Sequence, residues 1–204
     1  MIDKAIFIWI PKTAGTSITE VLEMNGFQGY RWKYQIFSTI NNKVHYCHYS
    51  IFHLIKYNYV PKKFIDEAFK FTFVRNPYDR LISLFFYLKK REGKLTRGLS
   101  FKEFLYSLKK NITEVGLYNV KGNSQANNQY KWITTEIDFI GNYENLQQDF
   151  NTLCSILGIE EQELPIKRKT NHKEYQYYYD DETKQLVDEI YNKDFEIFNY
   201  EQVL

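Results

Sequence analysis

Two short apolar runs, each followed by a polar turn and a helical pattern, organise the first half of the chain. Residues 5–10 are almost continuously apolar, which is typical of a strand buried on both faces of a parallel sheet. The run ends at Pro11, and apolar residues then recur at helical spacing over residues 16–24, with Gly26 placed to end the helix. Residues 5–25 therefore predict a strand, a tight loop and a helix.

The same order recurs further along the chain. Residues 70–75 predict a second buried strand, which runs directly into a polar turn. Pro77 is well tolerated at the first position of a helix, and apolar residues follow on one face of residues 77–88. This segment is again predicted as a strand, a turn and a helix.

The remaining patterns extend this alternation. Two further strands are expected at residues 43–48 and 136–140. Further helices are expected at residues 100–110, 124–132, 144–157 and 181–193. Alternating strands and helices predict an α/β fold with a central parallel sheet flanked by helices, and such sheets bind ligands at the carboxyl ends of their strands. No repeat or linker interrupts the chain, so residues 1–204 are expected to form a single domain.

Composition narrows the functional classes. The chain has 27 Lys and Arg against 25 Asp and Glu, so no overall field attracts nucleic acid or an anionic membrane, and any anion site must be local. The two cysteines, Cys47 and Cys154, are too few for a disulfide framework, which favours a reducing compartment. No apolar run approaches the roughly 20 residues of a membrane span, and no secretory leader is evident, so we expect a cytoplasmic protein.

The loop after the first strand carries candidate chemistry. Its small residues allow successive backbone N–H groups to converge on one point, and a helix N-terminus adds about half a positive charge. Lys12 supplies a full positive charge, so the loop predicts a phosphate or sulfate site. The alternative is that Thr16 or Ser17 only caps the helix and Lys12 is solvated. The candidate binding residues are Lys12, Thr13, Ala14, Gly15, Thr16 and Ser17.

The loop differs from a nucleoside-triphosphate loop. That loop needs two glycines separated by four residues and a lysine directly before the Ser or Thr. Here Lys12 precedes Gly15, and no apolar strand ending in Asp offers a magnesium site. Triphosphate hydrolysis is therefore disfavoured.

Arg75 follows the second predicted strand, where its planar guanidinium can bind a second phosphate through two hydrogen bonds. Ser83, a polar residue within an apolar helix, is placed to donate to the same group. The alternative is that Arg75 pairs with a carboxylate such as Asp79, and that Ser83 bonds back to its own helix. Two anion sites after two strands predict a ligand with phosphate-like groups at separate ends.

These residues resemble a known family. The segment FIWIPKTAGTSI resembles the 5′-phosphosulfate loop of sulfotransferases that use 3′-phosphoadenosine 5′-phosphosulfate (PAPS). The segment FTFVRNPYDRLISLF resembles the 3′-phosphate-binding element of the same enzymes. Weaker similarity to the carbohydrate-directed branch, which contains bacterial members and the heparan sulfate 2-O-sulfotransferases, continues through residues 138–146 and 194–200. The resemblance spans most of the chain and implies a P-loop-like sulfotransferase fold.

The resemblance also implies a reaction. In this family a sulfuryl group passes from PAPS to an acceptor hydroxyl by in-line displacement, which leaves adenosine 3′,5′-bisphosphate (PAP), and no metal is required. Lys12 would stabilise the charge that develops on the leaving group. Arg75 and Ser83 would hold the 3′-phosphate.

A general base must accept the proton of the acceptor hydroxyl, and histidine is the usual candidate. Carbohydrate-directed members carry a His between the two phosphate motifs, and His48 is the best match, with His45 in reserve. The alternative is that His48 is a buried or capping histidine.

In addition to His45, two further residues are candidates for contacting the acceptor. Gln129 lies in QANNQYKW, which resembles a region where related enzymes place a Gln near the substrate, and Lys173 belongs to the basic segment 167–173. The expected partner is a carbohydrate or glycoconjugate acceptor, with no nucleic acid and no membrane span. The alternatives are a nucleotide-binding module without catalysis and, less favoured, a nucleotide or small-molecule kinase. The acceptor and the oligomeric state are not predicted by the sequence.

Overall fold

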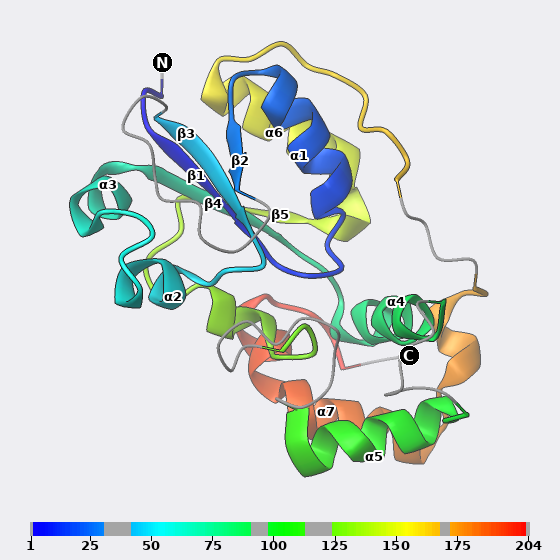
Figure 1. Cartoon of the computed structure of the whole chain (residues 1–204). Coiled ribbons are helices and arrows are strands. Elements are labelled where there is room, and N and C mark those ends of the chain that lie inside the picture. The colour runs from blue at the N-terminus through cyan, green and yellow to red at the C-terminus, as the bar shows by residue number, and fades with distance from the viewer. Residues whose placement is uncertain (1, 31–41, 91–97, 113–123, 168–171, 203–204) are drawn as a thin grey trace. The chain divides into compact units, whose positions relative to one another are not determined.

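A single parallel sheet forms the centre of the fold (Figure 1). The computed structural model describes residues 2–30, 42–90, 98–112, 124–167 and 172–202. Its strands follow the order β2-β3-β1-β4-β5, and each neighbouring pair of strands is parallel. The strands are β1 (Ala5–Trp9), β2 (Gln28–Tyr30), β3 (Lys43–Cys47), β4 (Phe69–Val74) and β5 (Phe139–Asn142).

Contacts divide the chain into two compact units, each of which is described by itself. The sheet unit comprises Met1–Val74 and Trp132–Arg168, and the helical unit comprises Arg75–Lys131 and Lys169–Leu204. The sheet unit contains α1 (Gly15–Met24), α2 (Ile51–Lys56), α3 (Lys62–Glu67), the 3₁₀ turn η3 (Tyr143–Asn145) and α6 (Leu146–Leu157). The helical unit contains α4 (Pro77–Lys90), α5 (Phe101–Asn111), the 3₁₀ turn η4 (Tyr175–Tyr178) and α7 (Asp181–Ile197). A further 3₁₀ turn, η2 (Gln129–Trp132), ends at the boundary. That the chain is one domain stays a prediction.

The central strand is apolar because both of its faces are covered. Every residue of β1 is buried, and Phe7 stacks on Phe71 of β4 with ring centroids 5.3 Å apart. On this face the core continues into Leu22 of α1 and Phe150 of α6, and Figure 1 shows both helices on the same side of the sheet. The parallel register brings the chain out of β1 and β3 at one edge.

Amphipathic helices form the core of the helical unit. Leu81, Phe85 and Leu88 give α4 one apolar face, which packs in a cluster with Phe104 of α5 and Val187 of α7. Capping boxes start α5 and α7, at Ser100 with Glu103 and at Asp180 with Thr183. The capping residues fix where each helix begins.

The predicted α/β architecture is confirmed, and the two strand–turn–helix segments lie within two residues of their predicted bounds. The predicted helix at residues 124–132 is wrong, because only the 3₁₀ turn η2 forms there and the preceding residues are held by side-chain hydrogen bonds. The patterns also missed the short elements β2, α2 and α3.

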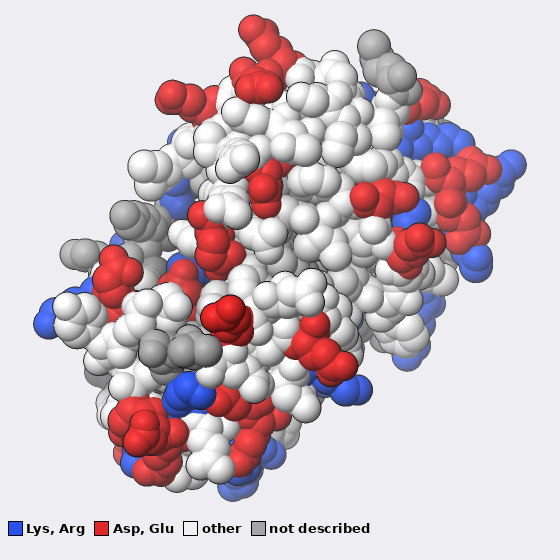
Figure 2. All heavy atoms as spheres, turned by 180° about the vertical axis from the view of Figure 1, so that it is seen from behind, with Lys and Arg blue, Asp and Glu red and all other residues white. Residues whose placement is uncertain are grey.

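Charged side chains are dispersed. Figure 2 shows acidic and basic residues interspersed over one face, among a larger uncharged area. Within the described part of the chain, no helix combines the length and apolarity that crossing a bilayer needs.

Candidate functional site

The loop between β1 and α1 is folded by two residues in left-handed conformation. Lys12 has φ 72° and Ala14 has φ 62°, values that L-residues rarely adopt. Between them, the buried Thr13 donates its hydroxyl to the carbonyl of Ile10 at 3.0 Å, which closes the turn. Strained backbone of this kind is concentrated at ligand sites, where it directs successive N–H groups into one concavity.

The N-terminus of α1 is suited to an anion. Ala14 is the N-cap residue and provides no side-chain cap, and the first turn holds no acidic residue. Thr16 and Ser17 lie inside the first turn, so the interpretation that either one caps the helix is wrong. The orphan N–H groups and the helix dipole therefore act together with the half-buried Lys12.

One indole fixes the shape of this loop. Trp9 ends β1, and a Cβ atom at Gly15 would overlap its ring. Only glycine allows α1 to begin this close to the strand. The requirement for Gly15 is therefore packing, as well as the approach of a ligand to the backbone.

His48 lies at the carboxyl end of β3, in the same unit as the loop. Its φ of 60° turns the ring beside Trp9, at 5.1 Å between centroids, and Trp132 lies at 6.4 Å. Its Nδ1 lies 3.4 Å from the carbonyl oxygen of Trp9. Donation through Nδ1 leaves Nε2 as the basic nitrogen, which is the tautomer a general base requires. The ring is partly exposed, so it is accessible to a substrate.

His45 has a different environment. Its side chain is fully buried within β3, and its Nε2 lies 2.9 Å from Oε1 of Glu23 on α1. This contact ties the strand to the helix. The base role assigned to His48 therefore has the better geometric support, and His45 as a substrate contact stays a prediction.

In the helical unit, Arg75 precedes α4 and is held by it. The Nε and Nη2 atoms of Arg75 lie 2.8 and 2.7 Å from Oδ2 of Asp79, so the ion pair that the sequence offered as an alternative is present. Ser83 follows Asp79 by one turn on the same face of α4, and its side chain is buried. The ion pair with Asp79 thus holds the guanidinium of Arg75 at the face of α4 that carries Ser83.

The side chain of Gln129 binds the backbone of Arg75. Its Nε2 donates to the carbonyl of Arg75 at 2.8 Å, and its Oε1 accepts from the Arg75 N–H at 3.0 Å. The side chain is fully buried. Both the nitrogen and the oxygen of the amide thus bond to the backbone of Arg75. These bonds indicate that Gln129 positions Arg75. A substrate contact by Gln129 stays a prediction that this geometry does not support.

A buried charge pair holds the segment that carries Gln129. Arg80 donates through Nη2 to the carbonyls of Gln125 and Asn127, at 2.8 and 3.0 Å. Asp194 accepts the N–H of Gln129 at 2.7 Å. Burial lowers the pKa of Arg80 and raises that of Asp194, and in each case the charge of the other group opposes the shift. The charge of each residue thus offsets part of the effect of burial on the other, and both residues satisfy backbone groups of the loop.

Lys173 lies on the surface of the helical unit. Its Nζ lies 5.3 Å from the ring centroid of Tyr177, and its backbone N–H donates to the hydroxyl of Tyr178. Residues 168–171 of the predicted basic segment lie outside the described residues. The role of Lys173 as an acceptor contact stays a prediction.

Comparisons with known proteins agree with the fold. The model of the Sulfotransferase family matches residues 3–201. The chain belongs to the sulfotransferase family. The predictions of this family and of a PAPS-dependent transferase are thereby confirmed.

Individual relatives are more distant. An uncharacterized protein of Archaeoglobus fulgidus is 32% identical over 113 residues, which cover 55% of this chain and 86% of that protein. A crystal structure of mouse sulfotransferase SULT7A1 complexed with PAP has a TM-score of 0.61 at 14% identity, covering 95% of this chain and 84% of the mouse chain. A crystal structure of a sulfotransferase from Alicyclobacillus acidocaldarius has a TM-score of 0.54 at 13% identity, covering 98% of both chains. At these identities the structures show a shared fold.

Most of the residues that support this candidate site escaped the sequence reasoning. They are Trp9, Arg80, Trp132 and Asp194. Only the pairing of Asp79 with Arg75, four residues apart, was offered by the sequence, as an alternative. The other contacts join segments far apart in sequence.

The packing of Gly15 against Trp9 is directly testable. Gly15→Ala should lower the free energy of unfolding by about 1–3 kcal/mol, because the added methyl group displaces the indole. Urea denaturation measures this change. Ala14→Gly is the matched control, and it should cause no comparable loss because Ala14 already has φ 62°. Equal stability of Gly15→Ala and the parent chain would contradict the packing role.

Proposed function

We propose that this sulfotransferase moves a sulfuryl group from PAPS to a hydroxyl of a carbohydrate or glycoconjugate. The observation that carries the proposal is the loop before α1, with its two left-handed residues, its uncapped helix N-terminus and its lysine. Such a loop fits a phosphosulfate, and the chain belongs to a family named for the reaction. The carbohydrate acceptor rests on the resemblance to the carbohydrate-directed branch.

The residues divide the chemistry between them. When bound, PAPS supplies a sulfuryl group whose S–O bond to the 5′-phosphate breaks as the acceptor oxygen bonds to sulfur. The α1 N-terminus and Lys12 would bind the 5′ end, and Lys12 would stabilise the negative charge on the departing phosphate oxygen. His48 would accept the proton of the acceptor hydroxyl at Nε2. Arg75 and Ser83 would bind the 3′-phosphate.

The leaving-group role of Lys12 predicts a kinetic signature. Lys12→Ala should lower kcat by about 100- to 1,000-fold, because a fixed cation acts mainly on charge that develops in the transition state. The dissociation constant of PAP, measured by calorimetry, should change much less. A loss confined to nucleotide binding, with kcat intact, would assign Lys12 to ground-state binding alone.

The 3′-phosphate role of Arg75 predicts a change in ligand preference. Arg75→Ala should remove the preference for PAP over AMP in calorimetric titration, since AMP lacks the 3′-phosphate. Arg75→Lys should keep part of the preference because it retains the charge and loses the planar fork. If Arg75→Ala discriminates between the two nucleotides as the parent chain does, another residue binds the 3′-phosphate.

The base role of His48 is tested by separating turnover from binding. His48→Ala should lower kcat by about 100-fold or more, with PAP affinity retained. His45→Asn is the comparison, and its folded fraction should keep its turnover because His45 contacts Glu23 inside the unit. Substantial activity in His48→Ala would move the role to His45 or to a carboxylate. PAP binding without transfer to any acceptor in a glycan panel, by the parent chain, would favour the non-catalytic module.

A further inference from the structure

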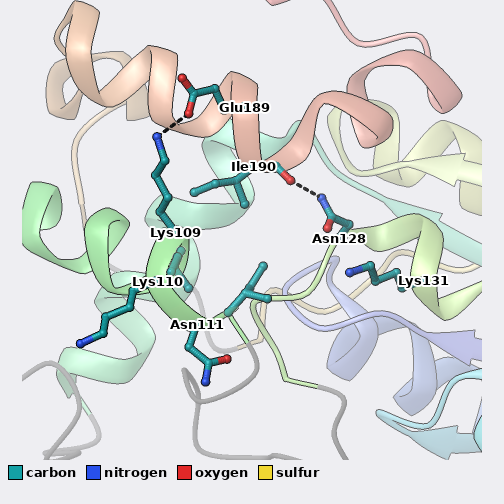
Figure 3. Close-up of a pocket in the computed structure, with 9 residues that line it drawn as sticks. Lys109, Lys110, Asn111, Asn128, Lys131, Glu189 and Ile190 are labelled. Carbon is teal, nitrogen blue, oxygen red and sulfur yellow. Dashed lines mark hydrogen bonds and ion pairs between the residues drawn. The ribbon is translucent and has the colours of Figure 1, made fainter.

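The helical unit contains a hollow of about 480 Å³ at the C-terminal end of α5 (Figure 3). It is lined from three segments, namely the end of α5, the residues around η2, and α7. None of its lining residues belongs to the candidate site described above. The side chains that the following argument uses are Lys109, Lys110, Lys131, Asn128, Glu189 and Ile190.

The wall of the hollow combines apolar surface with a fixed amide. Ile112 and Ile190 are partly buried hydrophobic residues that pack against the core of the helical unit. Asn128 is 6% exposed and donates its Nδ2 to the carbonyl of Ile190 at 2.7 Å. This bond fixes the orientation of the amide, which faces the hollow in Figure 3. Apolar surface beside a rigid amide suits a sugar ring, which offers C–H faces and hydroxyl groups.

The rim of the hollow is positively charged. Lys109 forms an ion pair with Glu189 at 2.6 Å, so these two charges offset each other. Lys110 and Lys131 are exposed, and neither forms an ion pair with a carboxylate of the described residues. The lining thus holds three lysines and one glutamate, and two of the lysine charges are uncompensated there.

A fourth lysine adds to the positive charge near η2. The Nζ atoms of Lys131 and Lys193 lie 6.0 and 5.6 Å from the ring centroid of Tyr130. Both ammonium groups therefore add positive charge beside this tyrosine. The local charge contrasts with the near-neutral chain, whose formal net charge is +2.

We propose that this hollow is a subsite for an acidic sugar of an oligosaccharide acceptor. Lys131 would bind its carboxylate or sulfate group, and Lys110, on the opposite side of the hollow in Figure 3, would bind the acidic group of a neighbouring sugar. Asn128 would bind a hydroxyl, and the two isoleucines would contact the ring. The inference rests on the proposed function and narrows its acceptor to acidic glycans. A nucleic acid is less suited, because the described residues that line the hollow include no aromatic ring on which bases could stack.

Calorimetric titration at low ionic strength tests the subsite directly. The probes are tetragalacturonate, which carries a carboxylate on each sugar, and maltotetraose, a neutral oligosaccharide of equal length. The parent chain should bind tetragalacturonate and bind maltotetraose much more weakly. The double variant Lys110→Gln/Lys131→Gln should weaken tetragalacturonate binding by about tenfold, the sum of two solvent-exposed charge contacts. Added salt should reduce the difference between the chains.

A matched control separates a local site from overall charge. The double variant Lys62→Gln/Lys63→Gln removes the same amount of positive charge, but from α3 in the sheet unit. It should leave the affinity for tetragalacturonate unchanged. If both double variants weaken tetragalacturonate binding equally, the effect comes from the net charge of the protein, and the proposal is overturned. Equal binding of both probes by the parent chain, or no binding of either, would overturn it as well.

The outcome is distinguishable from that of the proposed function. If the chain sulfates glycans and binds PAP but does not distinguish acidic from neutral acceptors, the subsite fails while the function stands. If tetragalacturonate binding depends on Lys110 and Lys131 but no sulfate is transferred, the subsite stands while the function fails. Where transfer occurs, the double variant should raise KM for an acidic acceptor and leave kcat and PAP affinity unchanged.

Discussion

The arrangement of the helical unit depends on a buried, irregular segment whose backbone must find hydrogen-bond partners inside the protein. Residues 124–130 form no α-helix, yet most of their side chains are buried, so side chains must satisfy the peptide groups. Arg80 binds two of the carbonyls, and Asp194 binds the N–H groups of Gln129 and Tyr130. Because the two opposite charges offset part of each other's burial, removing one of them alone would cost more than losing both together. The segment is therefore fixed, and so is the amide of Gln129 that holds the backbone of Arg75.

Trp9 has a corresponding role in the sheet unit. Its indole covers the start of α1 and requires glycine at position 15, while its carbonyl lies within reach of Nδ1 of His48. One residue at the end of the central strand thus contacts both the candidate anion-binding loop and the candidate base. The rings of Trp9 and Trp132 lie 5.1 and 6.4 Å from the His48 ring between centroids, so both indoles restrict how that ring can turn. A base whose orientation is fixed before the substrate binds loses less entropy in the reaction.

How much the sequence predicts depends on the range of the interactions involved. Buried strands and amphipathic helices are recorded in local periodicity, so β1, α1, β4 and α4 were predicted nearly to the residue. The three-residue strand β2 is too short for a period to be visible. The helix predicted at residues 124–132 is wrong because its contacts with Arg80 and Asp194 cross 45 and 65 residues of chain. Local motifs likewise led to the candidates Lys12, Arg75 and His48, whose roles stay predictions, whereas the contacts of Trp9, Trp132 and Asp194 required the fold.

The pairing of Arg75 with Asp79 bears on how such a site achieves selectivity. A carboxylate at hydrogen-bond distance offsets part of the guanidinium charge, which weakens attraction to anions in general. The same carboxylate fixes the direction of the remaining N–H groups, so an anion gains from Arg75 only where it meets them in the right geometry. Ser83, one turn further along α4, lies on the face that carries Asp79. If Arg75 binds the 3′-phosphate as proposed, a chain of nearly balanced charge would distinguish one phosphate position from another through orientation, without a basic surface that would collect unrelated polyanions.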